Sequence, residues 1–191
     1  DKQFSIALVG CGSVAQNHLN ALTMLENVKI VALCDIKAER AAALGERFAP
    51  DAVIYESYEE MIEKAKPDSV HICTPHYLHF PMASLALKKN INVFLEKPIT
   101  INTEEADALI ELEKKSEAKL CFQNRFLKAV ADAKKIIAED GGVEAAYCSV
   151  FWKRTKDYYI SSGWRGKYAT EGGGVMINQA IHTIDLLTQF I

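Results

Sequence analysis

The sequence predicts an α/β fold: a doubly wound parallel sheet, followed by the beginning of an α+β domain with a mainly antiparallel sheet. Strand-like and helix-like segments alternate through the first two-thirds of the chain, and the strand-like segments are almost continuously apolar. Parallel strands need crossover connections, and strands that are apolar on both sides are covered by helices on both faces. After about Gln123 the alternation stops, which indicates a second domain.

The first domain is expected over residues 1–122. Its strands are predicted from short apolar runs at 4–9, 28–34, 52–54, 69–73, 91–95 and 119–122. Its helices are predicted at 15–25, 37–48, 79–89 and 103–116, with one more that begins near residue 57. Ser57 and Glu60 form a capping box there, and Thr103 is expected to cap the 103–116 helix.

The second domain, residues 123–191, is predicted to contain a helix at 129–138, a strand at 144–152 and an apolar helix at 175–190. Further strands would be needed to bury that strand and helix. We therefore expect a fragment or shortened chain with only part of this domain. The alternative is a minimal form that completes its core by association.

The composition excludes several classes of function. The 191 residues are 49% apolar and 25% charged, with a net charge of −3 and a pI near 6.0, so nothing favours nucleic acid or an anionic membrane as a partner. No apolar run approaches the ~20 residues of a membrane span, and no targeting signal is visible. The five cysteines have no paired spacing, which argues against disulfides and a metal site and favours the cytoplasm.

A glycine loop, Gly10-Cys11-Gly12-Ser13-Val14-Ala15, joins the first strand to the first helix. Such a loop lets a pyrophosphate approach the N–H groups of a helix N-terminus, and a carboxylate such as Asp35 after the second strand accepts the ribose hydroxyls of NAD. The expected cofactor contacts here are Gly10, Gly12, Ser13, Val14 and Asp35. Lys37 and Arg40 leave NADP possible, and the alternative is a plain strand–helix turn with a capping aspartate.

Two further motifs follow predicted strands. Glu96-Lys97-Pro98 places an ammonium where it can hydrogen-bond a substrate hydroxyl, and a cis Lys–Pro bond would fix its direction; a simple turn lysine is the alternative. Thr74-Pro75, with His76 and His79 after them, is expected to border the cofactor and build a loop rather than act in catalysis.

The last motif is Gly172-Gly173-Gly174, which precedes Asn178, His182 and Asp185. Asn178 and His182 are four residues apart and share one face of a helix, and Asp185 can reach the same side. A histidine can accept a hydroxyl proton while a cofactor accepts hydride; a buried, hydrogen-bonded histidine is the alternative.

Aromatic and cationic residues alternate between these motifs. They are Trp152, Lys153, Arg154, Tyr158, Tyr159, Trp164, Arg165 and Lys167. Aromatic faces with interleaved cations suit a sugar or polyol, and they suit a subunit interface equally well.

In this combination and order the motifs resemble the glucose–fructose oxidoreductase / inositol dehydrogenase / rhizopine-catabolism (Gfo/Idh/MocA) family, with Asn124-Arg125 as a further matching pair. The resemblance implies an NAD(P)-dependent dehydrogenase with a Rossmann domain, acting on a C–OH of a sugar, cyclitol or related polyol. It implies that Lys97 and His182 line the site beside the nicotinamide, and that the second domain's open sheet forms a homo-oligomer, a dimer or tetramer.

We therefore expect Lys97, His182 and Asn178 as catalytic residues, and Thr74, Pro75, His79, Glu96 and Lys97 as further cofactor contacts. The expected substrate contacts are Arg125, Trp164, Arg165, Asn178 and His182. Many relatives carry aspartate at the position of Asn178, which weakens a charge-assisted role for His182. A non-catalytic NAD(P)-binding regulatory protein and an NAD-assisted glycosidase or lyase are the alternatives.

Overall fold

The computed structural model describes residues 3–113 and 117–191. The chain divides into two units, Asp1–Leu120 and Cys121–Ile191, so the first unit ends two residues before the predicted domain boundary. The last part of the helix predicted over 103–116 falls on residues 114–116, outside the described residues.

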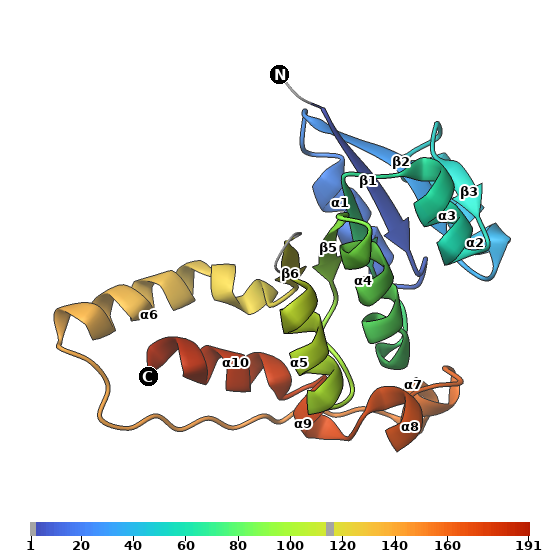
Figure 1. Ribbon diagram of the computed structural model, residues 1–191. Helices are drawn as coiled ribbons and strands as arrows, with labels where there is room; N and C mark the ends of the chain where they lie inside the picture. The colour runs from blue at the N-terminus through green and yellow to red at the C-terminus, as the bar shows by residue number, and fades with distance from the viewer. Residues whose placement is uncertain (1–2, 114–116) are drawn as a thin grey trace. The chain divides into compact units, whose positions relative to one another are not determined.

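Six parallel strands form the sheet of the first unit (Figure 1). They are β1 (Phe4–Val9), β2 (Val28–Cys34), β3 (Val53–Tyr55), β4 (Ser69–Ile72), β5 (Asn92–Leu95) and β6 (Ala118–Leu120). Their order across the sheet is β3-β2-β1-β4-β5-β6, so the chain builds outward on one side of β1 and then on the other. This order confirms the predicted doubly wound parallel sheet.

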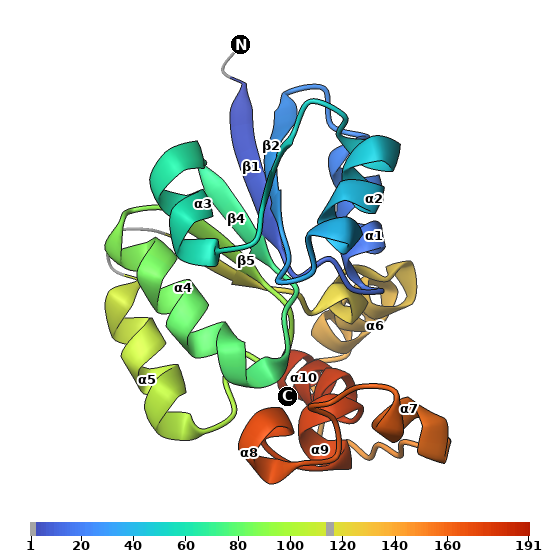
Figure 2. The ribbon, with the colours of Figure 1, turned by 90° about the vertical axis from the view of Figure 1, so that its right-hand side faces the viewer.

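Five α-helices connect the strands and cover both faces of the sheet. They are α1 (Ala15–Leu22), α2 (Ala38–Phe48), α3 (Tyr58–Ala65), α4 (His79–Lys88) and α5 (Thr103–Leu112), with a short 3₁₀ turn η1 (His76–Leu78) before α4. In Figure 2, α1 and α2 lie on one face of the sheet, and α3, α4 and α5 lie on the other.

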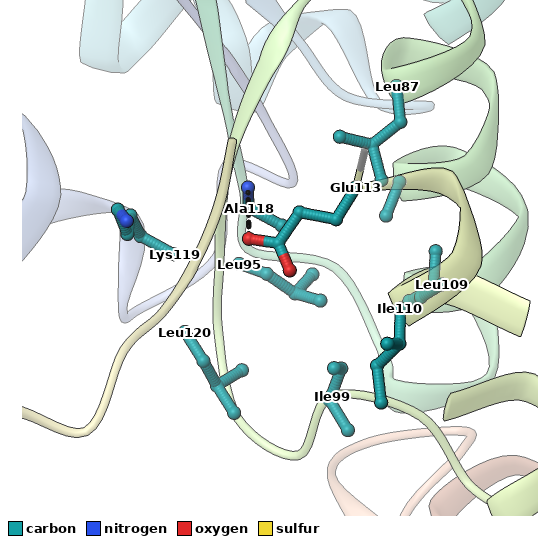
Figure 3. Close-up of a pocket in the computed structure, with 10 residues that line it drawn as sticks. Leu87, Leu95, Ile99, Leu109, Ile110, Glu113, Ala118, Lys119 and Leu120 are labelled. Atoms are coloured by element: carbon teal, nitrogen blue, oxygen red, sulfur yellow. Dashed lines mark hydrogen bonds between the residues drawn. The ribbon is translucent and has the colours of Figure 1, made fainter. Parts of the chain in front are cut away.

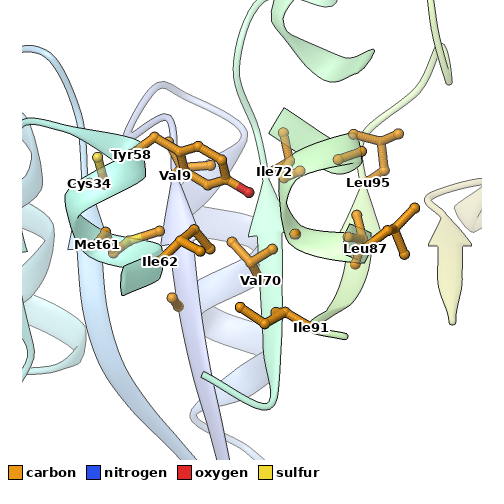
Figure 4. Close-up of a cluster of buried hydrophobic side chains, with 14 of the residues drawn as sticks. Val9, Cys34, Tyr58, Met61, Ile62, Val70, Ile72, Leu87, Ile91 and Leu95 are labelled. Carbon is orange, nitrogen blue, oxygen red and sulfur yellow. The ribbon is translucent and has the colours of Figure 1, made fainter. Parts of the chain in front are cut away.

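Two apolar cores result, because neighbouring strand residues point to opposite faces. Ile6 and Leu8 of β1 pack with Leu19 of α1 in one core, whereas Ala7 and Val9 belong to the other. The second core contains buried side chains of α3, α4 and β4, among them Tyr58, Met61, Ile62, Val70, Ile72 and Leu87 (Figure 4). A strand with no polar face is thus buried on both sides.

The helix starts test the predicted capping residues. The Ser57 hydroxyl accepts a hydrogen bond from the Glu60 N–H at 3.2 Å, which confirms this N-cap. The prediction for Thr103 is wrong, because the Asn102 carboxamide accepts from the Glu105 N–H at 2.9 Å. Asn102 has the extended backbone of an N-cap residue, and asparagine is as good a cap as threonine.

The second unit is helical in the residues that the structure describes. Its helices are α6 (Lys128–Glu139), α7 (Lys156–Ile160), α8 (Tyr168–Glu171), α9 (Val175–Asn178) and α10 (Ile181–Phe190), preceded by a 3₁₀ turn η2 (Gln123–Phe126). Helices α6 and α10 contact each other (Figure 1), and the Lys134 ammonium donates to the Gln189 carboxamide at 2.8 Å.

The predicted strand at 144–152 does not form in this structure. The segment has no regular secondary structure, and its aromatic residues Tyr147 and Phe151 are 91% and 95% exposed. A strand is stable only when its backbone groups pair with a neighbour, and no described segment of residues 121–191 is a strand. The antiparallel sheet of this domain therefore stays a prediction.

The predicted helix at 175–190 is interrupted. Helix α9 ends at Asn178 and α10 begins at Ile181, and between them the Ala180 N–H donates to the Val175 carbonyl, five residues back, at 2.8 Å. The wider turn buries Asn178, Gln179 and Ala180 together. Asn178 and His182 thus lie on consecutive helices, not on one face of a single helix.

Three of the five cysteines, Cys11, Cys34 and Cys73, are buried in the first unit. None of the five, all within the described part of the chain, forms a disulfide. Burial raises the pKa of the Cys11 and Cys34 thiols to about 12, so both are neutral, packing side chains.

Among the helices described above, none combines the length and apolar character needed to traverse a bilayer.

Candidate functional site

The candidate site of the first unit lies where the strand order changes direction, between β1 and β4. All strands are parallel, so the loops after β1, β2, β4 and β5 emerge at the same edge of the sheet. Those loops carry the glycine motif, Asp35, Thr74-Pro75 and Glu96-Lys97. In open α/β sheets a ligand binds at the carboxyl edge of such a switch point.

The two glycines of the loop have different roles. Gly10 has φ +88°, and a Cβ at this position would lie 2.7 Å from the Cys73 carbonyl carbon, so no larger residue fits. At Gly12 a Cβ would meet nothing within 4 Å, and Gly12 and Ser13 are exposed at the start of α1. The backbone before α1 is therefore open for a pyrophosphate to approach the helix N-terminus.

Asp35 follows β2 and is bonded directly to the glycine loop. Its carboxylate accepts the Cys11 N–H at 2.8 Å through one oxygen and the Lys37 N–H at 2.9 Å through the other. Each carboxylate oxygen has a second lone pair, which can accept a ribose hydroxyl. Open backbone at Gly12 and an adjacent fixed carboxylate match what NAD requires, so these residues fit the cofactor.

His79 connects two of the loops at this edge. One ring nitrogen lies 2.6 Å from the Pro98 carbonyl oxygen and the other 2.9 Å from the Thr74 carbonyl oxygen. The side chain is 0% exposed, and burial lowers the pKa of its imidazole. His79 thus joins the Thr74 and Pro98 loops, and its contact with the cofactor stays a prediction, as do those of Thr74 and Pro75, which are half-buried at the edge.

Glu96 and Lys97 follow β5, and the Glu96 N–H continues the sheet pairing by donating to the Ile72 carbonyl at 3.0 Å. The Lys97–Pro98 peptide bond is cis, which confirms the expectation for this motif. The Glu96 carboxylate bonds the Lys97 N–H at 3.3 Å and lies 3.0 Å from the His18 Nε2 atom. The backbone that carries the Lys97 side chain is thus held by sheet pairing and by Glu96.

Sequence reasoning missed two histidines of this unit, His18 on α1 and His71 in β4. Their Nδ1 atoms are 3.0 Å apart, and His71 stacks on the Phe94 ring at 4.7 Å between centroids. Burial, and secondarily the nearby His18, lowers the pKa of His71 to about 3. One hydrogen bond thus joins the two Nδ1 atoms, and a second joins the His18 Nε2 atom to the Glu96 carboxylate.

A weak sequence signal for this network existed. His71 interrupts the apolar strand Ser69–Ile72, and a polar ring in a strand buried on both faces must find a hydrogen-bond partner. Which partner it finds depends on the strand order and on the turn of α1, so spacing alone did not indicate it.

In the second unit, Asn178 and His182 are both buried. The Asn178 amide donates to the Glu171 carboxylate and, at 3.3 Å, to the Tyr158 hydroxyl. Glu171 is only 2% exposed and also accepts the Gly166 N–H at 2.5 Å. Sequence reasoning did not find Glu171, which accepts the hydrogen bond that holds the Asn178 amide.

His182 and Asp185 have different surroundings in the second unit. The His182 ring packs edge-to-face on Phe122, with 6.0 Å between centroids. Asp185 forms a two-point ion pair with Arg125, in which the Arg125 Nε lies 2.8 Å from a carboxylate oxygen. Arg125 is therefore paired with Asp185, and its contact with a substrate stays a prediction. His182 and Lys97 belong to different units, so their proximity also stays a prediction.

A shallow apolar pocket of about 60 Å³ in the first unit lies between the α4–α5 layer and the edge strands (Figure 3). It is lined by Ala83, Leu87, Leu95, Ile99, Leu109, Ile110, Glu113, Ala118, Lys119 and Leu120. The Glu113 carboxylate accepts the Ala118 N–H at 3.1 Å, the bond drawn in Figure 3. The pocket lacks the glycine loop and Asp35, so it is not the cofactor site.

Comparison with known proteins agrees with this geometry. The family model of oxidoreductases with an NAD-binding Rossmann fold (Gfo/Idh/MocA) matches residues 4–124. Inositol 2-dehydrogenase of Salmonella typhimurium is 32% identical over 134 residues, 68% of this chain and 40% of that protein. A glycosyl hydrolase family 109 protein of Phocaeicola vulgatus is 34% identical over 118 residues, 58% of this chain and 23% of that protein.

Among solved structures, the WlbA dehydrogenase of Chromobacterium violaceum, in complex with NADH and UDP-GlcNAcA, is 30% identical with a TM-score of 0.91. That match covers 100% of this chain and 56% of that one. The chain thus spans less than two-thirds of the length of each of these relatives. The predicted family and NAD-binding Rossmann fold are confirmed.

Proposed function

We propose, from the premise that this chain belongs to the Gfo/Idh/MocA family of oxidoreductases with an NAD-binding Rossmann fold, that the whole protein is a dehydrogenase. It transfers a hydride between NAD and a C–OH of a sugar, cyclitol or related polyol. The observation that carries the proposal is the fixed Asp35 carboxylate beside the open glycine loop, at the edge where Lys97 also emerges. The binding site for the dinucleotide follows β1 and β2, and the cation suited to a substrate hydroxyl follows β5, at the same edge of the sheet.

Each residue of the proposal has its own chemical role. When bound, the nicotinamide supplies the hydride acceptor. His182 takes the hydroxyl proton as the C–H electron pair leaves and the C–O bond becomes a carbonyl. The Lys97 ammonium hydrogen-bonds the same oxygen and stabilises the negative charge that develops there. Asn178, held by Glu171, orients the substrate.

Relatives support this reading. Inositol 2-dehydrogenase and the WlbA dehydrogenase are named for oxidoreductase activities, and the WlbA structure contains NADH with a sugar nucleotide. For the coenzyme we propose a preference for NAD over NADP, because the Asp35 carboxylate repels a 2′-phosphate.

The test is a survey of NAD⁺ and NADP⁺ reduction by the whole protein against sugars and cyclitols. We expect NADH formation with at least one of them, and a fall in kcat of roughly a hundredfold or more for Lys97→Ala and for His182→Ala. Turnover that is unchanged in both variants would overturn the assigned roles. NAD⁺ binding by both variants, measured by calorimetry, separates lost chemistry from lost folding.

An NAD-assisted glycosidase is a second candidate, because a glycosyl hydrolase family 109 protein is among the relatives. In such an enzyme the sugar is oxidised and reduced again within each cycle, so NAD is not consumed. Release of an aryl glycoside's leaving group without net NADH formation would identify this function. Net NADH formation from a free sugar would identify the dehydrogenase.

The assembly and the compartment are also proposals. Large exposed side chains of the second unit, such as Phe126 at 88% and Phe151 at 95%, support a homo-oligomer that covers them through the completed domain. Cysteines without disulfides support a reducing compartment, the cytoplasm. Light scattering on the whole protein tests the first statement.

A further inference from the structure

We propose that Arg154 and Arg165 form a binding site for an oxyanion on the substrate, so that the substrate is an acidic sugar and not a neutral polyol. This inference rests on the proposed dehydrogenase function and narrows its substrate class. The two guanidinium carbons lie 4.6 Å and 4.5 Å from the centre of one ring, that of Tyr158. Each guanidinium also packs on a tryptophan, Arg154 on Trp152 at 4.3 Å and Arg165 on Trp164 at 4.6 Å.

The charges in this aromatic–arginine cluster, made of Trp152, Arg154, Tyr158, Trp164 and Arg165, are not balanced by carboxylates. No carboxylate of residues 3–113 or 117–191 forms an ion pair with either arginine. Both Nε atoms are buried and have no hydrogen-bond partner in that part of the chain. Two like charges held against one ring repel each other, and an anion bound to the guanidiniums lowers that repulsion.

The nearby acidic residues do not supply that anion. Glu171, the buried carboxylate of the region, bonds the Gly166 N–H and the Asn178 amide. Asp157 is exposed on α7 and forms no ion pair with either guanidinium. The cluster therefore keeps two cations, both half-buried and still accessible from solvent.

The cluster is directly connected to the residues expected to hold the substrate. The hydroxyl of Tyr158 accepts a hydrogen bond from the Asn178 amide at 3.3 Å. Asn178 precedes His182 by four residues, and both are buried in the same unit. The proposed oxyanion site thus adjoins Asn178, the residue proposed to orient the substrate.

Arginine at both positions specifies the chemistry of the ligand. A guanidinium fork matches the two oxygens of a carboxylate or a phosphate, and a stacked guanidinium is already oriented for such bonds. A neutral polyol would leave both cations without an anion. The ligand group is therefore an oxyanion, and it comes either from the carboxylate of a uronic acid or from the diphosphate of a nucleotide sugar.

Fluorescence gives a direct binding test, because Trp152 and Trp164 are the only tryptophans of the 191-residue chain and both belong to the cluster. The chain is titrated with glucuronate, with UDP and with glucose as the neutral control. We expect saturable changes with glucuronate or UDP and none with glucose; the response to each anion shows which source binds. No response to either anion would overturn the proposal.

Substitutions of the two arginines test whether they bind the anion. Arg154→Gln and Arg165→Gln are each expected to weaken binding of the responding anion about tenfold. Lys156→Gln removes the same charge from an exposed side chain outside the cluster and is expected to leave that affinity unchanged. Equal weakening by all three variants would mean a general charge effect and would contradict a built site.

Kinetics on the whole protein separates this proposal from the proposed function. We compare NAD⁺ reduction with glucuronate against glucose, and with UDP-glucose against glucose. The charged substrate is expected to have the higher kcat/KM, with an advantage that falls about tenfold in Arg154→Gln through KM. If neutral sugars are oxidised with a kcat/KM as high as that of charged sugars, only the acidic-sugar inference is overturned. If no sugar gives NADH, the dehydrogenase function is overturned.

Discussion

His18 and Glu96 are 78 residues apart in the sequence, yet the Nε2 atom of the imidazole lies 3.0 Å from a carboxylate oxygen, and both side chains are largely buried. The contact joins the first helix after the glycine loop to the strand end that carries Lys97. Because the Glu96 carboxylate also bonds the Lys97 N–H, His18 holds the backbone on which the proposed catalytic cation is mounted.

His18→Phe is therefore expected to reduce stability by about 2 kcal/mol, since the buried carboxylate loses a charge-assisted hydrogen bond. Urea unfolding followed by circular dichroism measures the difference. Asn20→Ala, an exposed change on the same helix, is the control and should shift stability by less than about 0.5 kcal/mol. A His18→Phe protein as stable as the parent would show that the contact contributes nothing.

His71 makes the stability of the first unit sensitive to acid. Its pKa is about 3 in the folded chain and near 6.5 when unfolded, so between these values only the unfolded chain binds the proton. Stability then falls as the pH falls from about 6.5, by up to about 1.4 kcal/mol per pH unit. His79, whose pKa burial also lowers, acts in the same direction.

His71→Gln should flatten this dependence, measured as the urea midpoint between pH 7 and pH 4. Phe94→Leu is the matched control, because it removes the stacked ring and keeps the titrating imidazole. It should lower stability by a similar amount at every pH. Parallel curves for the parent and His71→Gln would refute the assignment to His71.

Gly10 and Gly12 offer a matched pair of substitutions. Gly10→Ala should destabilise the chain by about 2 kcal/mol or more, because φ is +88° and the new methyl group would meet the Cys73 backbone. Gly12→Ala should leave the melting temperature nearly unchanged, since its Cβ meets nothing, and weaken NAD⁺ binding where the pyrophosphate approaches. Calorimetric melting and NAD⁺ titration of both proteins check the contrast, and equal effects on both measurements would contradict it.

Asp35→Ser tests the choice of coenzyme. Loss of the carboxylate removes the acceptor for ribose hydroxyls and the repulsion of a 2′-phosphate, so NAD⁺ affinity should fall about tenfold and the affinity for NADP⁺ relative to NAD⁺ should rise. Dissociation constants for both coenzymes measure this. Asp51→Ser removes the same charge from an exposed position and should change neither constant; a similar response from both variants would rule out a local role.

The parts of the structure that local pattern controls were predictable. The apolar strands Phe4–Val9 and Val28–Cys34 indicated a sheet covered on both faces, and the glycine loop with Asp35 indicated the cofactor edge. The His18–His71–Glu96 network was not predictable, because its members come from α1, β4 and the end of β5 and meet only after the strand order is set.

Two other differences have the same origin. The segment 144–152 has the alternation of a strand, but pairing depends on a neighbouring strand that local sequence does not specify. The break between α9 and α10 places Asn178 next to Glu171 and Tyr158, contacts that a single continuous helix pattern does not contain. Local periodicity predicts an element, whereas tertiary contacts decide whether it forms and where it ends.

The two hydrogen bonds of Asp35 carry an evolutionary consequence. The residue proposed to select the coenzyme also fixes the backbone at Cys11 and at Lys37, so a substitution of Asp35 simultaneously releases two backbone donors. A lineage that switches to NADP must first, or at the same time, acquire another acceptor for those N–H groups. Attempts to redesign the coenzyme preference should therefore begin with paired substitutions. A single exchange at Asp35 lowers the stability of the fold, whatever it does to the affinity for NADP.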